Sequence, residues 1–147
     1  MTKEFNIYKC KLVREKQISY KSEIRNPDDV FGAAKAMGFV DYTEEVLGIL
    51  TTDIKGGVTG YHEISRGDLN TAVVHPREIY KRVLLTNSSA IILVHNHPSG
   101  DVTPSEKDIQ VTKRLVEVGE IMGVPVLDHL IIGSNGNYFS MKTNGLL

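Results

Sequence analysis

The side chains best suited to chemistry are two histidines one residue apart, followed by a serine and an aspartate three apart. They are His95, His97, Ser105 and Asp108. Imidazole nitrogens and a carboxylate oxygen are ligands that zinc prefers, and three of them leave its fourth tetrahedral position open to water. That is the pattern of a catalytic site, in which the ion lowers the pKa of the water to about 7. The alternative interpretation is that these residues only cap and turn the chain.

The segment before the first histidine, at residues 90–94, reads AIILV and is continuously apolar. Such a run is typical of a strand buried on both faces. Alternate residues of a strand point to the same face, so this strand is expected to present His95 and His97 side by side. The Pro-Ser-Gly run that follows lets the chain turn back.

A helix is predicted after this turn, over residues 103–123. Thr103 is expected as its N-cap and Pro104 as its first residue, with Glu106 completing a Thr-x-x-Glu capping box. This start places Ser105 inside the first turn, where capping does not require it.

The apolar stripe of the same helix continues into the aspartate. Three residues back from the first member of the stripe is Asp108, so its carboxylate is expected to point inward. A buried carboxylate must be paired, hydrogen-bonded or metal-bound, because an isolated buried charge costs several kcal/mol. The members of the stripe are Val111, Leu115, Val118 and Met122.

A hydrolytic site also needs a base that takes a proton from the attacking water. The candidate is Glu63, with its neighbour His62 as the alternative. Adjacent strand residues face opposite ways, so only one of the two can point into the site, and periodicity does not choose between them. Ser105 is expected to donate a hydrogen bond to the oxyanion that develops on a carbonyl.

The remaining elements follow from periodicity and turn residues. Strands and helices alternate in the second half of the chain, which predicts an α/β layered domain with a mixed sheet. The first 26 residues alternate apolar and charged residues, which suggests a strand pair or a half-buried arm. The expected elements are helices at 27–38 and 75–87, a hairpin of strands at 44–52 and 58–65, a buried strand at 124–133 and an edge strand at 137–141.

Composition narrows the class of protein. The 147 residues, 41% of them hydrophobic, suit a single globular domain. Lys plus Arg at 17 nearly balance Asp plus Glu at 18, so bulk charge does not favour binding to nucleic acid. No apolar run approaches the roughly 20 residues that span a membrane. The one cysteine, Cys10, permits no internal disulfide, which predicts a cytoplasmic protein.

The segment HNHPSGDVTPSEKD matches the His-x-His-x7-Ser-x2-Asp signature of the JAMM (JAB1/MPN/Mov34) metalloprotease superfamily and is similar to its bacterial RadC branch. Segments 65–82, 90–101 and 126–133 also resemble RadC proteins, so the resemblance covers about residues 44–147. It implies a cytidine-deaminase-like JAB/MPN fold with three α/β/α layers and a mixed central sheet. It implies a metal-binding domain at 41–147, preceded at 1–40 by an arm and a short helix packed on the core.

The resemblance also implies residue roles and an activity. It places zinc ligation on His95, His97 and Asp108, oxyanion stabilisation on Ser105 and the catalytic base on Glu63. Characterised members of the superfamily hydrolyse peptide or isopeptide bonds with zinc, so a protein or peptide substrate is expected.

DNA binding is less well supported than hydrolysis. RadC proteins commonly carry a helix-hairpin-helix region before the metal domain, and only about 40 residues precede that domain here. The favoured function is a zinc-dependent metallohydrolase. The alternative is a non-catalytic protein- or DNA-interaction module associated with DNA repair, and oligomeric state is left open.

Overall fold

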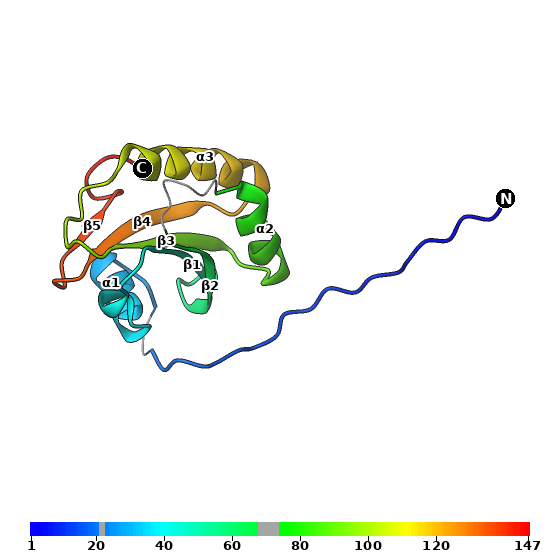
Figure 1. Cartoon of the computed structure of the whole chain (residues 1–147), viewed down its shortest axis with the longest axis horizontal. Helices are drawn as coiled ribbons and strands as arrows, with labels where there is room; N and C mark the ends of the chain where they lie inside the picture. The colour runs from blue at the N-terminus through cyan, green and yellow to red at the C-terminus, as the bar shows by residue number, and fades with distance from the viewer. Residues whose placement is uncertain (21–22, 68–73) are drawn as a thin grey trace.

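The computed structural model describes residues 1–20, 23–67 and 74–147, and its centre is a mixed five-stranded sheet (Figure 1). The strand order is β2-β1-β3-β4-β5. All neighbouring strands are antiparallel except β3 and β4, which are parallel. The elements are α1 (Pro27–Ala36), the 3₁₀ helix η1 (Phe39–Asp41), β1 (Val46–Thr52), β2 (Val58–Arg66), α2 (Pro76–Leu85), β3 (Ala90–His97), α3 (Glu106–Met122), β4 (Val126–Gly133) and β5 (Tyr138–Ser140).

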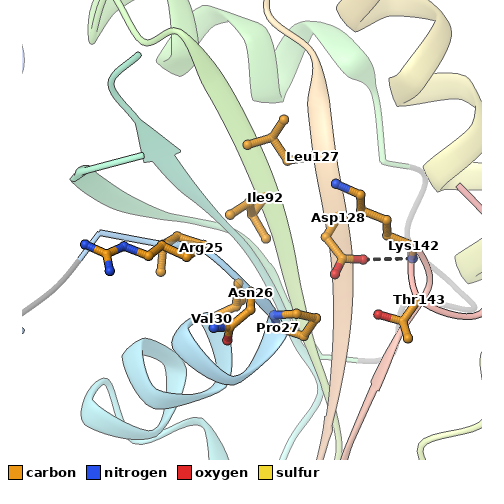
Figure 2. A pocket seen from close by; sticks show the side chains of 10 residues that line it. Arg25, Asn26, Pro27, Val30, Ile92, Leu127, Asp128, Lys142 and Thr143 are labelled. Atoms are coloured by element: carbon orange, nitrogen blue, oxygen red, sulfur yellow. Dashed lines mark hydrogen bonds between the residues drawn. The ribbon is translucent and has the colours of Figure 1, made fainter. Parts of the chain in front are cut away.

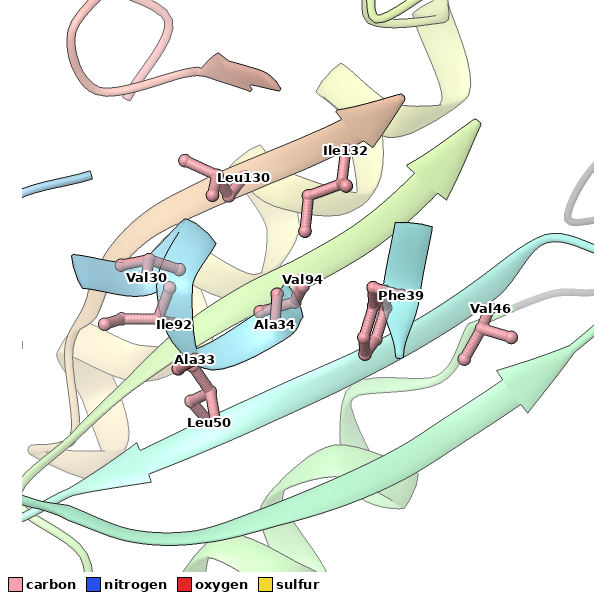
Figure 3. Packing of buried hydrophobic residues seen from close by; sticks show 10 residues of the cluster. All are labelled: Val30, Ala33, Ala34, Phe39, Val46, Leu50, Ile92, Val94, Leu130 and Ile132. Atoms are coloured by element: carbon pink, nitrogen blue, oxygen red, sulfur yellow. The ribbon is translucent and has the colours of Figure 1, made fainter. Parts of the chain in front are cut away.

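Helices cover both faces of this sheet. Residues of α1 and η1 form one hydrophobic cluster with the side chains on one face of β1, β3 and β4 (Figure 3). Residues of α2 and α3 form a second cluster with the side chains on the other face. The predicted three-layer α/β/α architecture with a mixed sheet is therefore confirmed, and α1 shares its core with the rest of the domain.

β3 is the central strand, as its apolar sequence predicts. It pairs with β1 on one side and β4 on the other, and every residue from Ala90 to Asn96 is buried. Side chains alternate between the two clusters, with Ile92 and Val94 towards α1 and Ile91 and Leu93 towards α2 and α3. His95 continues the second series, so it faces α3.

Residues 1–19 form neither the strand pair nor the half-buried arm that the sequence predicted. Residues 1–19 have no regular structure and are exposed, and they extend away from the body of the protein (Figure 1). Alternating apolar residues form a strand only when another strand supplies hydrogen bonds, and the described residues supply none to this segment. The chain meets the body at Tyr20, whose hydroxyl donates to the Asp29 carbonyl at 2.6 Å.

The N-terminus of α3 also differs from the prediction. Ser105, not Thr103, is the N-cap, and a Ser-x-x-Asp capping box with Asp108 replaces the expected Thr-x-x-Glu box. Thr103 instead donates its N–H to Asp101 Oδ1 at 3.0 Å, in a turn that precedes the helix. Both patterns satisfy the capping rule, and the two-residue shift shows that sequence alone did not choose between them.

No helix in the described part of the chain is long and apolar enough to cross a membrane. The predicted hairpin and the helix that starts at Pro76 are both present. The N-cap predicted for α1 is also confirmed, since the Asn26 side chain accepts the N–H of Asp29 at 3.0 Å.

Candidate metal centre

His95 and His97 lie at the carboxyl end of β3 with their ring centroids 4.9 Å apart. His95 is buried and His97 is mostly covered. Nδ1 of His95 is 3.2 Å from the Val46 carbonyl oxygen, and Nδ1 of His97 is 2.7 Å from that of Asp101. A carbonyl oxygen only accepts, so both Nδ1 atoms carry a proton and both Nε2 atoms are left to bind a ligand.

Helix α3 brings a carboxylate to the same point. Asp108 Oδ1 is 3.6 Å from His95 Nε2, and Oδ2 is 3.2 Å from His97 Nε2. The Ser105 N–H donates to Oδ2 at 2.8 Å, and the Asp108 N–H donates to Ser105 Oγ at 3.1 Å. The capping box of α3 thus fixes the carboxylate, and the four residues picked out by spacing do come together.

The protonation states of this cluster suit metal binding. Burial alone would raise the pKa of Asp108, but its hydrogen bonds with His97 and Ser105 and the charge of His95 hold that pKa well below its usual range. The hydrogen bond to Asp108 raises the pKa of His97 against the effect of burial. Burial lowers the pKa of His95 to about 4. In the metal-free protein, a proton on His97 Nε2 therefore lies between that nitrogen and Asp108 Oδ2. A metal ion bound by both groups would take its place.

The spacing of the donor atoms also fits zinc. Ligand atoms about 2.0 Å from one tetrahedral ion are about 3.3 Å from each other. The two separations between Asp108 oxygens and histidine Nε2 atoms are 3.6 and 3.2 Å, close to that value. Two imidazoles and one carboxylate are a donor set that zinc accepts, so the residues present fit a zinc ion.

Glu45 is the site residue that the sequence analysis missed. One of its carboxylate oxygens and one nitrogen of each histidine ring, in His95 and His97, all lie within 4.8 Å of one another. Glu45 directly precedes β1 and is partly buried. Continuing the β1–β3 register two residues beyond the pair Leu47–His95 places Glu45 opposite His97. The sequence places an acidic residue directly before β1, but only the pairing of β1 with β3 shows that this residue lies opposite His97.

The prediction that Glu63 serves this centre is wrong. Glu63 pairs with Gly48 of β1, which pairs with Val94 of β3, and Val94 packs in the cluster under α1. Paired residues of neighbouring strands share a face, so Glu63 lies on the opposite face from His95. Its carboxylate is exposed and lies 2.6 Å from the guanidinium of Arg66.

His62, the alternative to Glu63, lies on the correct face but outside the cluster. It pairs with Ile49, which packs against α2 and α3. Burial, and then the positive charge of Arg82, lower its pKa. The group of possible ligands that the described residues form consists of Glu45, His95 and His97. It includes neither His62 nor Asp108, but the Asp108 carboxylate lies 3.6 and 3.2 Å from the Nε2 atoms of the two histidines, whereas no such contact links His62 to them among the described residues.

A further histidine, His129 of β4, lies behind the centre. Its ring centroid is 6.1 Å from that of His95, and burial lowers its pKa to about 3. Thr112 donates its hydroxyl proton to the Asp108 carbonyl and is 2.6 Å from His129 Nδ1. The neighbouring Asp128 accepts from Ser140 Oγ at 2.6 Å, so its role is structural.

A pocket of about 420 Å³ lies on the other side of the sheet and is not part of this centre (Figure 2). It opens between the start of α1 and β4, and Ile92 at its wall belongs to the cluster under α1. The sheet separates it from His95. Its lining residues are Ile24, Arg25, Asn26, Pro27, Val30, Ile92, Leu127, Asp128, Lys142 and Thr143.

Fold and site together define an α/β/α domain that carries a candidate metal centre at the carboxyl end of its central strand. The family model described as the RadC-like JAB domain matches residues 24–146. The chain belongs to the RadC-like JAB domain family.

Curated relatives agree with this assignment. The chain is 44% identical over 133 residues to a UPF0758 protein of Syntrophomonas wolfei, an alignment covering 88% of this chain and 56% of the relative. It is 48% identical over 126 residues to a UPF0758 protein of Alkaliphilus oremlandii, covering 85% and 53%. The chain thus spans about half the length of the curated relatives it matches, and their names state no activity.

Proposed function

We propose that this chain is a zinc-dependent hydrolase that cleaves a peptide or isopeptide bond in a protein or peptide substrate. The observation that carries the proposal is the convergence of two histidine Nε2 atoms and the Asp108 carboxylate, with the Glu45 carboxylate beside the histidine rings. Membership of the RadC-like JAB family supports it, because the JAB superfamily is often hydrolytic.

His95, His97 and Asp108 would hold the ion, and a bound zinc supplies a Lewis acid that polarises a carbonyl and lowers the pKa of water to about 7. Glu45 then acts as the general base. Its carboxylate takes a proton from the water whose oxygen bonds to the carbonyl carbon. Glu45 passes that proton to the amine nitrogen as the C–N bond breaks, so the base is restored after each turnover.

Ser105 is proposed to stabilise the oxyanion. Its Oγ accepts the Asp108 N–H at 3.1 Å, which holds the hydroxyl beside the candidate ligands. The hydroxyl lies at the N-terminus of α3, where the helix dipole also favours negative charge. A hydrogen bond from the Ser105 hydroxyl would become stronger as negative charge develops on the carbonyl oxygen.

The test combines zinc analysis of the purified chain with cleavage of a proteome-derived peptide library, read by mass spectrometry. We expect one zinc per chain, which His97→Ala abolishes. Glu45→Gln should keep the zinc and lower cleavage by about 100-fold or more, the usual scale for a lost general base. Glu63→Gln is the matched control and should keep both properties, because Glu63 lies on the far face of the sheet.

Two results would contradict the proposal. The first is a chain without zinc under conditions that preserve it. The second is a zinc-loaded chain that cleaves no peptide in the library, which would favour a non-catalytic interaction module instead. Loss of cleavage in Glu63→Gln with full retention in Glu45→Gln would reverse the assignment of the base.

A further inference from the structure

We propose that Asn96, the residue between the two histidines, is a positioning residue that fixes Glu45 beside the metal ligands. The inference rests on the function proposed above, because it concerns the same site. Asn96 is buried near the carboxyl end of the central strand β3. Its side chain points to the face opposite His95 and His97, so it is not placed to be a ligand itself.

The carboxamide of Asn96 binds the backbone on both sides of Glu45. Oδ1 accepts the N–H of Val46 at 2.6 Å, and Nδ2 donates to the carbonyl of Glu44 at 3.0 Å. These two groups belong to the peptide units that precede and follow the Glu45 Cα. One side chain therefore fixes both peptide planes between which the Glu45 side chain is attached.

This contact occurs where the β1–β3 ladder ends. The last backbone pair in this direction is Leu47–His95, so the N–H of Val46 and the carbonyl of Glu44 lie beyond the ladder. Buried backbone groups need partners, and a carboxamide offers a donor and an acceptor side by side. The side chain of Asn96 therefore replaces the next backbone partner of β1 and holds the backbone of Glu45 in position.

The neighbouring residue strengthens this coupling. His95 Nδ1 donates to the Val46 carbonyl at 3.2 Å, so two consecutive residues of β3 hold the N–H and the carbonyl of Val46, the residue that follows Glu45. The strand that carries two candidate ligands thus also sets the position of the candidate base. A displacement of a catalytic group by about 1 Å can lower the rate by about 100-fold. The hydrogen bonds that hold the Glu45 backbone would therefore affect turnover.

The experiment compares Asn96→Ala with a matched control at the other end of the same strand pair. Thr52→Val removes a buried hydroxyl that donates to the Ala90 carbonyl at 3.4 Å, without touching Glu45. Hydrogen exchange of the Val46 amide is measured in the metal-free proteins. We expect about tenfold faster exchange in Asn96→Ala, equivalent to about 1.4 kcal/mol, and wild-type exchange in Thr52→Val.

The second readout is the visible spectrum of the cobalt-substituted chain, with Glu45→Gln as the reference for a missing carboxylate. Asn96→Ala should keep one cobalt per chain and shift its spectrum towards that of Glu45→Gln, whereas Thr52→Val should keep the wild-type spectrum. A wild-type spectrum in Asn96→Ala, or unchanged Val46 exchange, would overturn the inference. Failure of the wild-type chain to bind cobalt would instead contradict the proposed function, and the exchange of Val46 would still decide the role of Asn96.

Discussion

At the scale of single residues, the candidate centre combines two histidines whose pKa values shift in opposite directions. His95 is enclosed, and burial lowers its pKa to about 4, so it stays neutral with its Nε2 lone pair available. His97 is less buried, and its hydrogen bond to Asp108 raises its pKa. A metal ion entering this centre must therefore displace one proton, the one on His97, over the range in which that residue is protonated.

This difference predicts the pH dependence of metal affinity. Below the raised pKa of His97, zinc affinity should fall about tenfold per pH unit, with one proton released per ion bound. A second proton, from His95, should compete only as the pH approaches 4. Calorimetry in buffers of different ionisation enthalpy measures the number released. Release of two protons at pH 5 to 6 would contradict the assignment of the two rings.

His129 predicts an acid-sensitive step in the stability of the metal-free protein. Burial lowers its folded pKa from 6.5 to about 3, so between these values the unfolded chain binds more protons than the folded one. Its contribution to stability is therefore present above pH 6.5 and is lost as the pH falls towards 3. In His129→Gln the drop in Tm between pH 7 and pH 5 should become smaller. His75→Gln, outside the sheet, is the control and should keep the wild-type drop.

At the scale of elements, the site depends on how α3 lies on the sheet. The buried stripe of α3 is Asp108, Thr112, Leu115 and Gly119, so the same face that packs the core also carries the carboxylate. Near its other end, Gly119 lets the helix approach Tyr80 of α2. The Tyr80 hydroxyl donates to the Val124 carbonyl at 3.1 Å and so joins α2 to the segment between α3 and β4.

Gly119→Ala tests this close approach. Alanine favours an isolated helix by about 1 kcal/mol over glycine. Here, however, the added Cβ would lie 2.7 Å from both Tyr80 Oη and the Val124 carbonyl oxygen. We expect a lower Tm in thermal unfolding, against the helix propensity. Tyr80→Phe combined with Gly119→Ala should recover only part of the loss, because the backbone contact remains, and full recovery would assign the whole effect to the tyrosine.

At the scale of the whole molecule, the sheet separates two hydrophobic cores, and only one of them adjoins the candidate metal ligands. The core under α1 contains Phe39, whose ring packs against Tyr42 and Tyr61 with centroids 5.1 and 5.8 Å away. The core under α2 and α3 continues into the candidate metal centre, where His95 follows Leu93 on the same face of β3. Stability can therefore be changed on one side of the sheet without touching a candidate ligand.

Phe39→Ala is expected to cost about 3–5 kcal/mol, the usual loss for a buried phenylalanine, and to lower the Tm clearly. The folded variant should still bind one zinc per chain, because its cavity lies on the other face of the sheet. Thermal unfolding and zinc analysis measure the two effects. Ile121→Ala, at an exposed position of α3, is the control and should leave both unchanged. Loss of zinc from folded Phe39→Ala would show that the two cores are coupled.

Much of the centre could be read from local patterns. The apolar run of β3 fixes His95 and His97 on one face, because side chains alternate along any strand. The inward position of Asp108 follows from the helical period in the same way. These predictions needed only one element each, and the structure agrees with both positions.

Tertiary structure decided which residues of different strands and helices come together. Glu45 and Glu63 are both acidic residues in or next to one hairpin. The register of β1 against β3 puts Glu45 beside His97, and the register of β2 against β1 puts Glu63 on the opposite face. The use of Asn96 to hold the Glu45 backbone also depends on a contact between distant residues, because Asn96 and Val46 are 50 positions apart in the sequence. A one-residue change of register reverses every side chain of a strand, so local sequence determines which residues share a face, and pairing determines which of them meet.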